Sequence, residues 1–126
     1  RLNGSVAQMI SKILVPIFGD DVSPRFDLSA EVYILTVDDK GAYQDERIVV
    51  LPQISPEQLC HLILTENVGV VICGGIEEQY YQYLNWKRIR VYDSVIGPWA
   101  QAISRYLDGS LQPGDILYGQ KEKARQ

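Results

Sequence analysis

The sequence is poor in the residues that most often bind single metal ions. Its 126 residues include one histidine and two cysteines, and Cys60 and Cys73 are too far apart to form a C-x-x-C motif. A domain of this length with a normal apolar content folds without a disulfide, so we expect two reduced thiols and a cytoplasmic protein. No Cys–His or Ser–His–Asp arrangement indicates nucleophilic catalysis.

The sequence also lacks a long apolar run and an excess of positive charge. No segment approaches the roughly 20 apolar residues of a membrane-spanning helix, and no signal-peptide pattern is present. The formal net charge is −4, which disfavours nucleic acid because phosphates attract basic surfaces. The dense basic stretch at 87–90 alternates with apolar residues, like a strand with one solvated face. We therefore expect neither a membrane nor nucleic acid as a partner.

The composition that remains is that of one ordinary globular domain. Apolar residues make up 46% of the chain and charged residues 22%, which allows a proper hydrophobic core. We expect a single domain over residues 11–109. Residues 1–10 are polar and aperiodic, and we expect a disordered arm or an expression remnant. Residues 110–126 read as a loosely attached tail, of which 116–118 touch the domain.

Hydrophobic patterns predict five strands and three helices. Residues 12–17 and 68–73 are apolar strands, and residues 88–92 are a short strand with one solvated face. Residues 32–37 and 47–51 form a hairpin around a turn at 38–41. Helices begin at Ser55-Pro56, at Glu77-Glu78 and at Gly97-Pro98. The order β-β-β-α-β-α-β-α predicts an α/β protein with a five-stranded mixed sheet and helices on both faces. Right-handed crossovers make the first, fourth and fifth strands parallel.

Three motifs in this order resemble the dinitrogenase iron–molybdenum cofactor family, which includes the NifX and NafY accessory proteins and the C-terminal domain of NifB. They are V-S-P-R-F-D at 22–27, V-V-I-C-G-G-I at 70–76 and V-I-G-P at 95–98. The resemblance covers residues 11–109 and implies a ribonuclease H-like fold. It also implies a non-catalytic protein that binds or carries an iron–sulfur or iron–molybdenum type cluster. The sequence departs from the family after Phe26, where studied members often carry a histidine and this chain has Asp27, Leu28 and Ser29.

Two of these motifs are expected at one rim of the sheet. Ligands of open α/β sheets bind beyond the carboxyl ends of the strands, where the loop at 18–27 and the turn at 73–75 would meet. An anionic ligand there would meet the backbone amides of Gly74 and Gly75, a helix N-terminus and the Arg25 cation. A cysteine beside a helix N-terminus tends toward the thiolate, so Cys73 is the candidate ligand for iron or another soft metal.

Each candidate residue also has a simpler structural interpretation. The candidate cofactor-binding set is Ser23, Arg25, Phe26, Asp27, Cys73, Gly74 and Gly75. Cys73 could be a small buried residue at a strand end, the glycines could only turn the chain, and Ser23 and Asp27 could cap the loop. Phe26 is expected to fill the core beneath the loop. Both interpretations stay open at this point.

Two other functions remain as alternatives. One is an interaction or regulatory module, a homodimer without a cluster, whose contact surface is the aromatic helix around Tyr80 and Tyr83 together with the tail. A cluster carrier, in contrast, would have cluster donor or acceptor proteins as partners. The other is a metal-dependent nuclease on a ribonuclease H-like sheet, for which loop aspartates are available at 20, 21, 27 and 93. The first strand lacks the carboxylate that this chemistry needs, which disfavours the nuclease.

Overall fold

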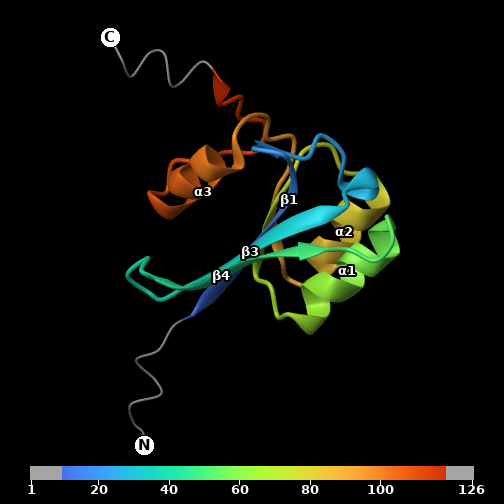
Figure 1. Ribbon diagram of the computed structural model, residues 1–126, viewed down its shortest axis with the longest axis horizontal. Helices are drawn as coiled ribbons and strands as arrows, with labels where there is room; N and C mark the ends of the chain where they lie inside the picture. Colours follow the sequence, from blue (N-terminus) through green and yellow to red (C-terminus); the bar gives the residue numbers. More distant parts are fainter. Residues whose placement is uncertain (1–9, 119–126) are drawn as a thin grey trace, which may run out of the picture.

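A computed structural model describes residues 10–118 as a mixed sheet with helices on both faces (Figure 1). The strands are β1 Ser11–Phe18, β2 Asp21–Val22, β3 Glu31–Val37, β4 Tyr43–Val50, β5 Val70–Ile72 and β6 Arg90–Tyr92. The helices are the 3-10 turn η2 Phe26–Leu28 and the α-helices α1 Pro56–Thr65, α2 Glu78–Trp86 and α3 Trp99–Leu107. The predicted α/β class and the order of the main elements are confirmed.

The sheet order is β4-β3-β1-β5-β6, which places the apolar strand β1 in the middle. β1 pairs with β5 and β5 with β6 in parallel, whereas β3 runs antiparallel to both β1 and β4. The predicted parallel arrangement of the first, fourth and fifth long strands is therefore confirmed. Pro16 lies two residues before the end of β1, opposite Val32 of β3.

The strand count differs from the prediction of five because β2 adds a sixth strand. β2 has two residues and pairs antiparallel with the end of β1, Val22 opposite Ile17. The Val22 N–H also donates to the Gly97 carbonyl at 2.8 Å. Turn-forming residues dominate the local sequence, so the pattern predicted a loop, and only contacts from distant segments make this stretch a strand.

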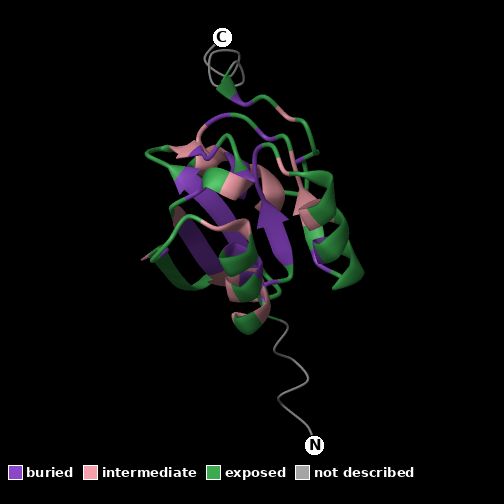
Figure 2. Ribbon diagram, turned by 90° about the vertical axis from the view of Figure 1, so that its right-hand side faces the viewer, coloured by how far each residue is buried: buried purple, intermediate pink, exposed green. Residues whose placement is uncertain are grey.

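Side chains that alternate along the strands pack into two separate hydrophobic cores, one on each face of the sheet. Ile13, Val15 and Ile17 of β1 pack toward α3, together with Ala102 and Ile103 from that helix. Leu14 of β1 points to the other face, where the core is completed by α1 and α2. Figure 1 shows α3 on one side of the sheet and α1 and α2 on the other, and Figure 2 shows the central strands buried between them.

The structure attaches residues 110–118 to the body more firmly than the sequence indicated. Leu117 is fully buried and belongs with Leu111 to the core beneath α3. The Leu117 N–H donates to the Ile96 carbonyl at 2.8 Å. The packed fold thus continues beyond residue 109, because two apolar anchors in a polar segment suffice to dock it. Residues 1–9 and 119–126, the rest of the predicted arm and tail, lie outside the described residues.

Candidate functional site

The two motif segments meet at one rim of the sheet, as the sequence predicted. β1 and β5 are parallel neighbours, so the chain that leaves each strand emerges at the same edge. The Phe26 N–H donates to the Gly75 carbonyl at 2.8 Å, and the Gly75 N–H donates to the Pro24 carbonyl at 2.9 Å. These two bonds form a short parallel bridge between Arg25 and Gly75. We call residues 23–27 and 73–75 together the rim.

Gly74 is required at the rim because the two segments touch there. A Cβ atom on Gly74 would lie 2.4 Å from the Ser23 carbonyl oxygen and 2.8 Å from that of Pro24. Such distances leave no room for any side chain. The same contact fills the space above the turn, so Gly74 serves close backbone packing and does not leave an open cradle for a ligand.

The other side of the turn is closed as well. The Ser94 N–H donates to the Gly74 carbonyl at 2.9 Å, and the Val95 N–H donates to the Cys73 carbonyl at 3.0 Å. The Cys73 N–H is itself bonded to the Tyr92 carbonyl at 3.0 Å. The expectation that the Gly75 amide is open to an anion is wrong for this conformation, because that N–H already has a partner in the loop.

Ser23 fastens the loop from inside. Both serines are buried. The Ser29 hydroxyl lies 2.9 Å from the Ser23 hydroxyl oxygen and 2.7 Å from the Arg25 carbonyl oxygen, within hydrogen-bond distance of each. The Ser23 hydroxyl also reaches that carbonyl, at 3.3 Å. This arrangement agrees with the loop-capping interpretation of Ser23. Ser29, one of the residues that follow Phe26 where family members often carry a histidine, is an equal member of this network.

Arg25 is the exposed cation of the rim, and Asp27 holds it. Its Nε and Nη2 atoms lie 3.0 and 2.5 Å from the two carboxylate oxygens of Asp27. The Arg25 side chain is 58% exposed, so it is open to solvent on its outer side. The hydrogen bond from Arg25 lowers the pKa of Asp27, and Glu77 adds a second negative charge near the guanidinium. An anion that binds Arg25 must therefore compete with Asp27.

Phe26 fills the core beneath the loop, as expected. Its side chain is almost fully buried and belongs to the core between the sheet, α1 and α2. Its ring lies 6.2 Å from that of Tyr80 on α2, in a stacked arrangement. Phe26 thus anchors the loop to the second helix and does not face solvent.

Of the two interpretations of Cys73 left open by the sequence, the structure supports the small buried residue at a strand end and not the poised thiolate. The side chain is fully buried within the same core as Phe26, and burial raises the pKa of the thiol. The negative charge of Asp93 raises this pKa further. A fully buried sulfur beneath the rim does not reach a metal held at the surface. Helix α2 begins at Glu78, so Cys73 is not one of its N-terminal residues.

The described residues do not supply a protein ligand set for a metal ion. Within residues 10–118, no three side chains of histidine, cysteine, aspartate or glutamate come together in a group that could hold one. The loop aspartates considered for a nuclease therefore do not converge.

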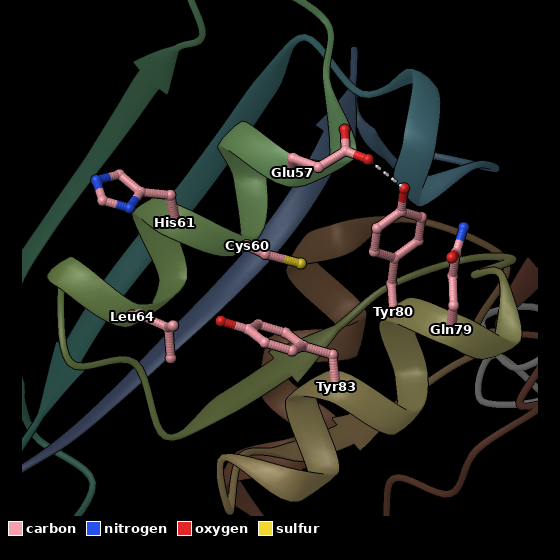
Figure 3. Close-up of a pocket in the computed structure, with 7 residues that line it drawn as sticks. All are labelled: Glu57, Cys60, His61, Leu64, Gln79, Tyr80 and Tyr83. Atoms are coloured by element: carbon pink, nitrogen blue, oxygen red, sulfur yellow. Dashed lines mark hydrogen bonds between the residues drawn. The ribbon is translucent and has the colours of Figure 1, made fainter.

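Away from the rim, a cavity lies between α1 and α2 that the sequence did not predict (Figure 3). Its volume is about 410 Å³, and its lining comprises Glu57, Cys60, His61 and Leu64 of α1 with Gln79, Tyr80 and Tyr83 of α2. The four α1 residues follow the spacing i, i+3, i+4, i+7, a signal from which this face could have been found. The Cys60 sulfur points into the groove and His61 points away from it (Figure 3). Burial raises the pKa of Cys60 to about 11, so this thiol is also neutral near pH 7.

The comparison with known families covers most of the chain. The profile of the family described as "Dinitrogenase iron-molybdenum cofactor" matches residues 9–109. No curated protein sequence matches the chain.

Solved structures share the fold over most of both chains. A candidate dinitrogenase from Methanocaldococcus jannaschii is 24% identical, with a TM-score of 0.67 over 82% of this chain and 94% of its own. The apo form of the orange protein from Desulfovibrio gigas is 24% identical, with a TM-score of 0.62 over 85% and 95%. A candidate NifB protein from Thermotoga is 18% identical, with a TM-score of 0.61 over 82% and 92%. At these identities the structures support the fold, and the profile match supplies the family. The chain belongs to the dinitrogenase iron–molybdenum cofactor family.

Proposed function

We propose that this protein is a non-catalytic carrier that binds an iron–sulfur or iron–molybdenum type cluster at the rim. The observation that carries the proposal is the bridge between Arg25 and Gly75, which brings the two family motifs together at the carboxyl edge of β1 and β5. Family membership over residues 9–109 supports the class of cargo. One structural relative is described as an apo form, which fits a protein with a loaded counterpart.

Arg25 is the side chain that contacts the cargo in this proposal. Clusters of this type carry negative charge, and Arg25 is the cation that the rim presents to solvent. A guanidinium offers several N–H donors in a fixed plane and pairs well with anions. Binding breaks the pair with Asp27, so Asp27 lowers the affinity for cargo. A lower affinity suits a carrier, because the cargo must be released to an acceptor.

The remaining predicted site residues shape the rim. Ser23 fastens the loop, Phe26 anchors it to the core, and Gly74 and Gly75 let the turn approach the loop. Cys73 supports the turn from below and is not a ligand unless the rim opens. The cargo keeps its own sulfide ligands and is held by charge and by hydrogen bonds.

This role places the protein among accessory factors of cofactor assembly. Its partners would be proteins that donate or accept the cluster, in a reducing, cytoplasmic compartment where Cys60 and Cys73 stay free. Within residues 10–118, no helix has the length and apolar character needed to cross a bilayer.

Metal retention by matched variants tests the proposal. The protein is incubated without oxygen with ferrous iron, sulfide and tetrathiomolybdate, then desalted, and iron and molybdenum per chain are measured. Arg25→Gln removes a charged hydrogen-bond partner and should weaken retention about tenfold or more. Lys40→Gln removes one positive charge from the distant hairpin turn and should leave retention unchanged. Asp27→Asn removes the carboxylate that competes for Arg25 and should raise metal retention.

Cysteine variants separate this mechanism from direct ligation. Cys73→Ser should retain metal about as well as Cys60→Ser, because both thiols are neutral and buried. If Cys73→Ser loses the metal while Arg25→Gln keeps it, the cluster is ligated by sulfur and the proposed mode of binding is wrong. If neither the wild-type protein nor any variant retains metal, the carrier function itself is contradicted.

A further inference from the structure

Strand β4 is a long edge strand whose C-terminal half exposes apolar side chains. It ends the sheet order, and among the described strands it pairs with β3 alone. Seven of its eight residues are exposed and Val49 is half-buried. Ile48 is 54% and Val50 66% exposed, although such β-branched side chains are normally used inside sheets. Exposed edges of this kind are templates for pairing with another strand.

The register shows which backbone groups face the free edge. The Leu51 N–H donates to the Ala30 carbonyl at 2.8 Å, which identifies these two as a hydrogen-bonded pair. Residues of an antiparallel strand alternate between bonding to the neighbour and pointing away from it. Every second residue from Leu51 therefore bonds to β3, and the backbone groups directed outward are those of Glu46, Ile48 and Val50.

The charged residues of β4 already have partners within the chain. The Tyr33 hydroxyl donates to Glu46 at 2.7 Å. Arg47 pairs with Glu66 on α1 and lies 3.9 Å from Asp45. Free charges on an edge strand normally prevent pairing with a second chain. The Arg47 charge is paired, but the neutral Tyr33 hydroxyl leaves the negative charge of Glu46 in place, so a second copy can pair here only if the two Glu46 carboxylates stay apart.

For a second copy around a twofold axis, charge and proline make an axis at Ile48 more favourable than one at Glu46, Arg47 or Val49. An axis at Glu46 or at Arg47 would place that charge directly opposite its own copy, which is destabilising. An axis at Val49 would run the overlap into Pro52, which has no N–H to donate. An axis at Ile48 places Ile48 opposite Ile48, with Val50 opposite Glu46 of the other copy. It gathers Ile48 and Val50 of both copies on one face and keeps the two Glu46 side chains apart.

We propose that β4 is a homodimer interface, in which two copies pair antiparallel about an axis at Ile48 and form one continuous sheet. This surface differs from the aromatic face of α2 around Tyr80 and Tyr83, where the sequence pattern placed a contact. It lies on the opposite edge of the sheet from β6 and does not depend on cluster binding.

Sedimentation velocity over a range of concentrations tests the interface. The average mass of the full chain should rise from 14.3 kDa toward twice that value as concentration increases. Ile48→Glu places two carboxylates face to face on the axis and should raise the dimer dissociation constant at least about tenfold. Ile116→Glu alters a similarly exposed isoleucine elsewhere and should not change it. Circular dichroism of both variants verifies that they are folded.

Engineered cysteines test the register. Ile48→Cys should give a covalent dimer on oxidation with copper phenanthroline, because the two sulfurs face each other across the axis. Val50→Cys faces Glu46 and should cross-link much less, and the native cysteines are buried. The proposal is overturned if the protein stays monomeric at every concentration, or if Ile48→Glu dimerises like the wild type. Preferential cross-linking through Val50→Cys would overturn the register.

Discussion

Gly74 lies where the loop and the turn of the rim come closest. Replacing it with alanine introduces a Cβ atom 2.4 Å from the Ser23 carbonyl oxygen, so one of the two segments must move. We expect Gly74→Ala to lower the free energy of unfolding by about 2–4 kcal/mol, as overpacking against backbone does. Urea denaturation measures this loss. Gly69→Ala is the matched control, because a Cβ there meets nothing within 4 Å, and equal effects of the two changes would contradict the close contact.

The Arg25–Asp27 pair should make stability depend on acid. Arg25 lowers the pKa of Asp27 in the folded protein, whereas the unfolded carboxyl titrates near its ordinary value of about 3.9. The pair therefore stabilises the fold above about pH 4, and this contribution is lost as the pH falls through the lower folded pKa. Asp27→Asn should shift the urea midpoint at pH 7 and not at about pH 2. A shift of the same size at both values would show that the charge is not involved.

For single residues, the sequence predicted which segments meet better than it predicted how their side chains pack. The motifs correctly put loop 23–27 and turn 73–75 together, because parallel neighbouring strands fix that geometry. Of the two interpretations of Cys73, the buried residue agrees with the structure and the thiolate does not. The local sequence could not decide between them, because the depth of a side chain at a strand end depends on how the helices pack over it. The Arg25–Asp27 pairing is set by a 3-10 turn that the loop composition does not reveal.

Helix α1 illustrates an element whose start is encoded locally. The Ser55 hydroxyl accepts a hydrogen bond from the Gln58 N–H at 3.2 Å, and Pro56 occupies the first helical turn. We expect Ser55→Ala to cost about 1 kcal/mol of stability, the usual effect of losing an N-cap. Thermal unfolding measures it. Ser55→Asp keeps an acceptor and should preserve the wild-type midpoint, and a loss as large as that of alanine would argue against capping.

Elements held by distant contacts were the ones that the sequence missed. The long strands and α1 to α3 follow from apolar periodicity and capping residues. β2 has only two residues, and the contact of Val22 with Gly97 creates it. β4 begins at Tyr43, earlier than predicted, because its polar first half forms a strand only through pairing with β3.

At the scale of the whole molecule, the segment after α3 belongs to the fold. Leu117 is fully buried beneath α3, whereas its neighbour Ile116 is 60% exposed. Leu117→Ala should lower the free energy of unfolding by about 2–5 kcal/mol, as large-to-small core changes do. Ile116→Ala should change it by less than about 1 kcal/mol. Urea denaturation of the pair distinguishes them, and a neutral Leu117→Ala would mean that residues 110–118 are dispensable.

The central claim for the whole molecule is that the rim carries a metal cluster. The most direct test is the metal content of the protein purified without oxygen from cells that make such clusters. The account predicts a coloured protein with iron, molybdenum or both in an amount close to one cluster per chain. A colourless protein free of both metals under those conditions would contradict the carrier function.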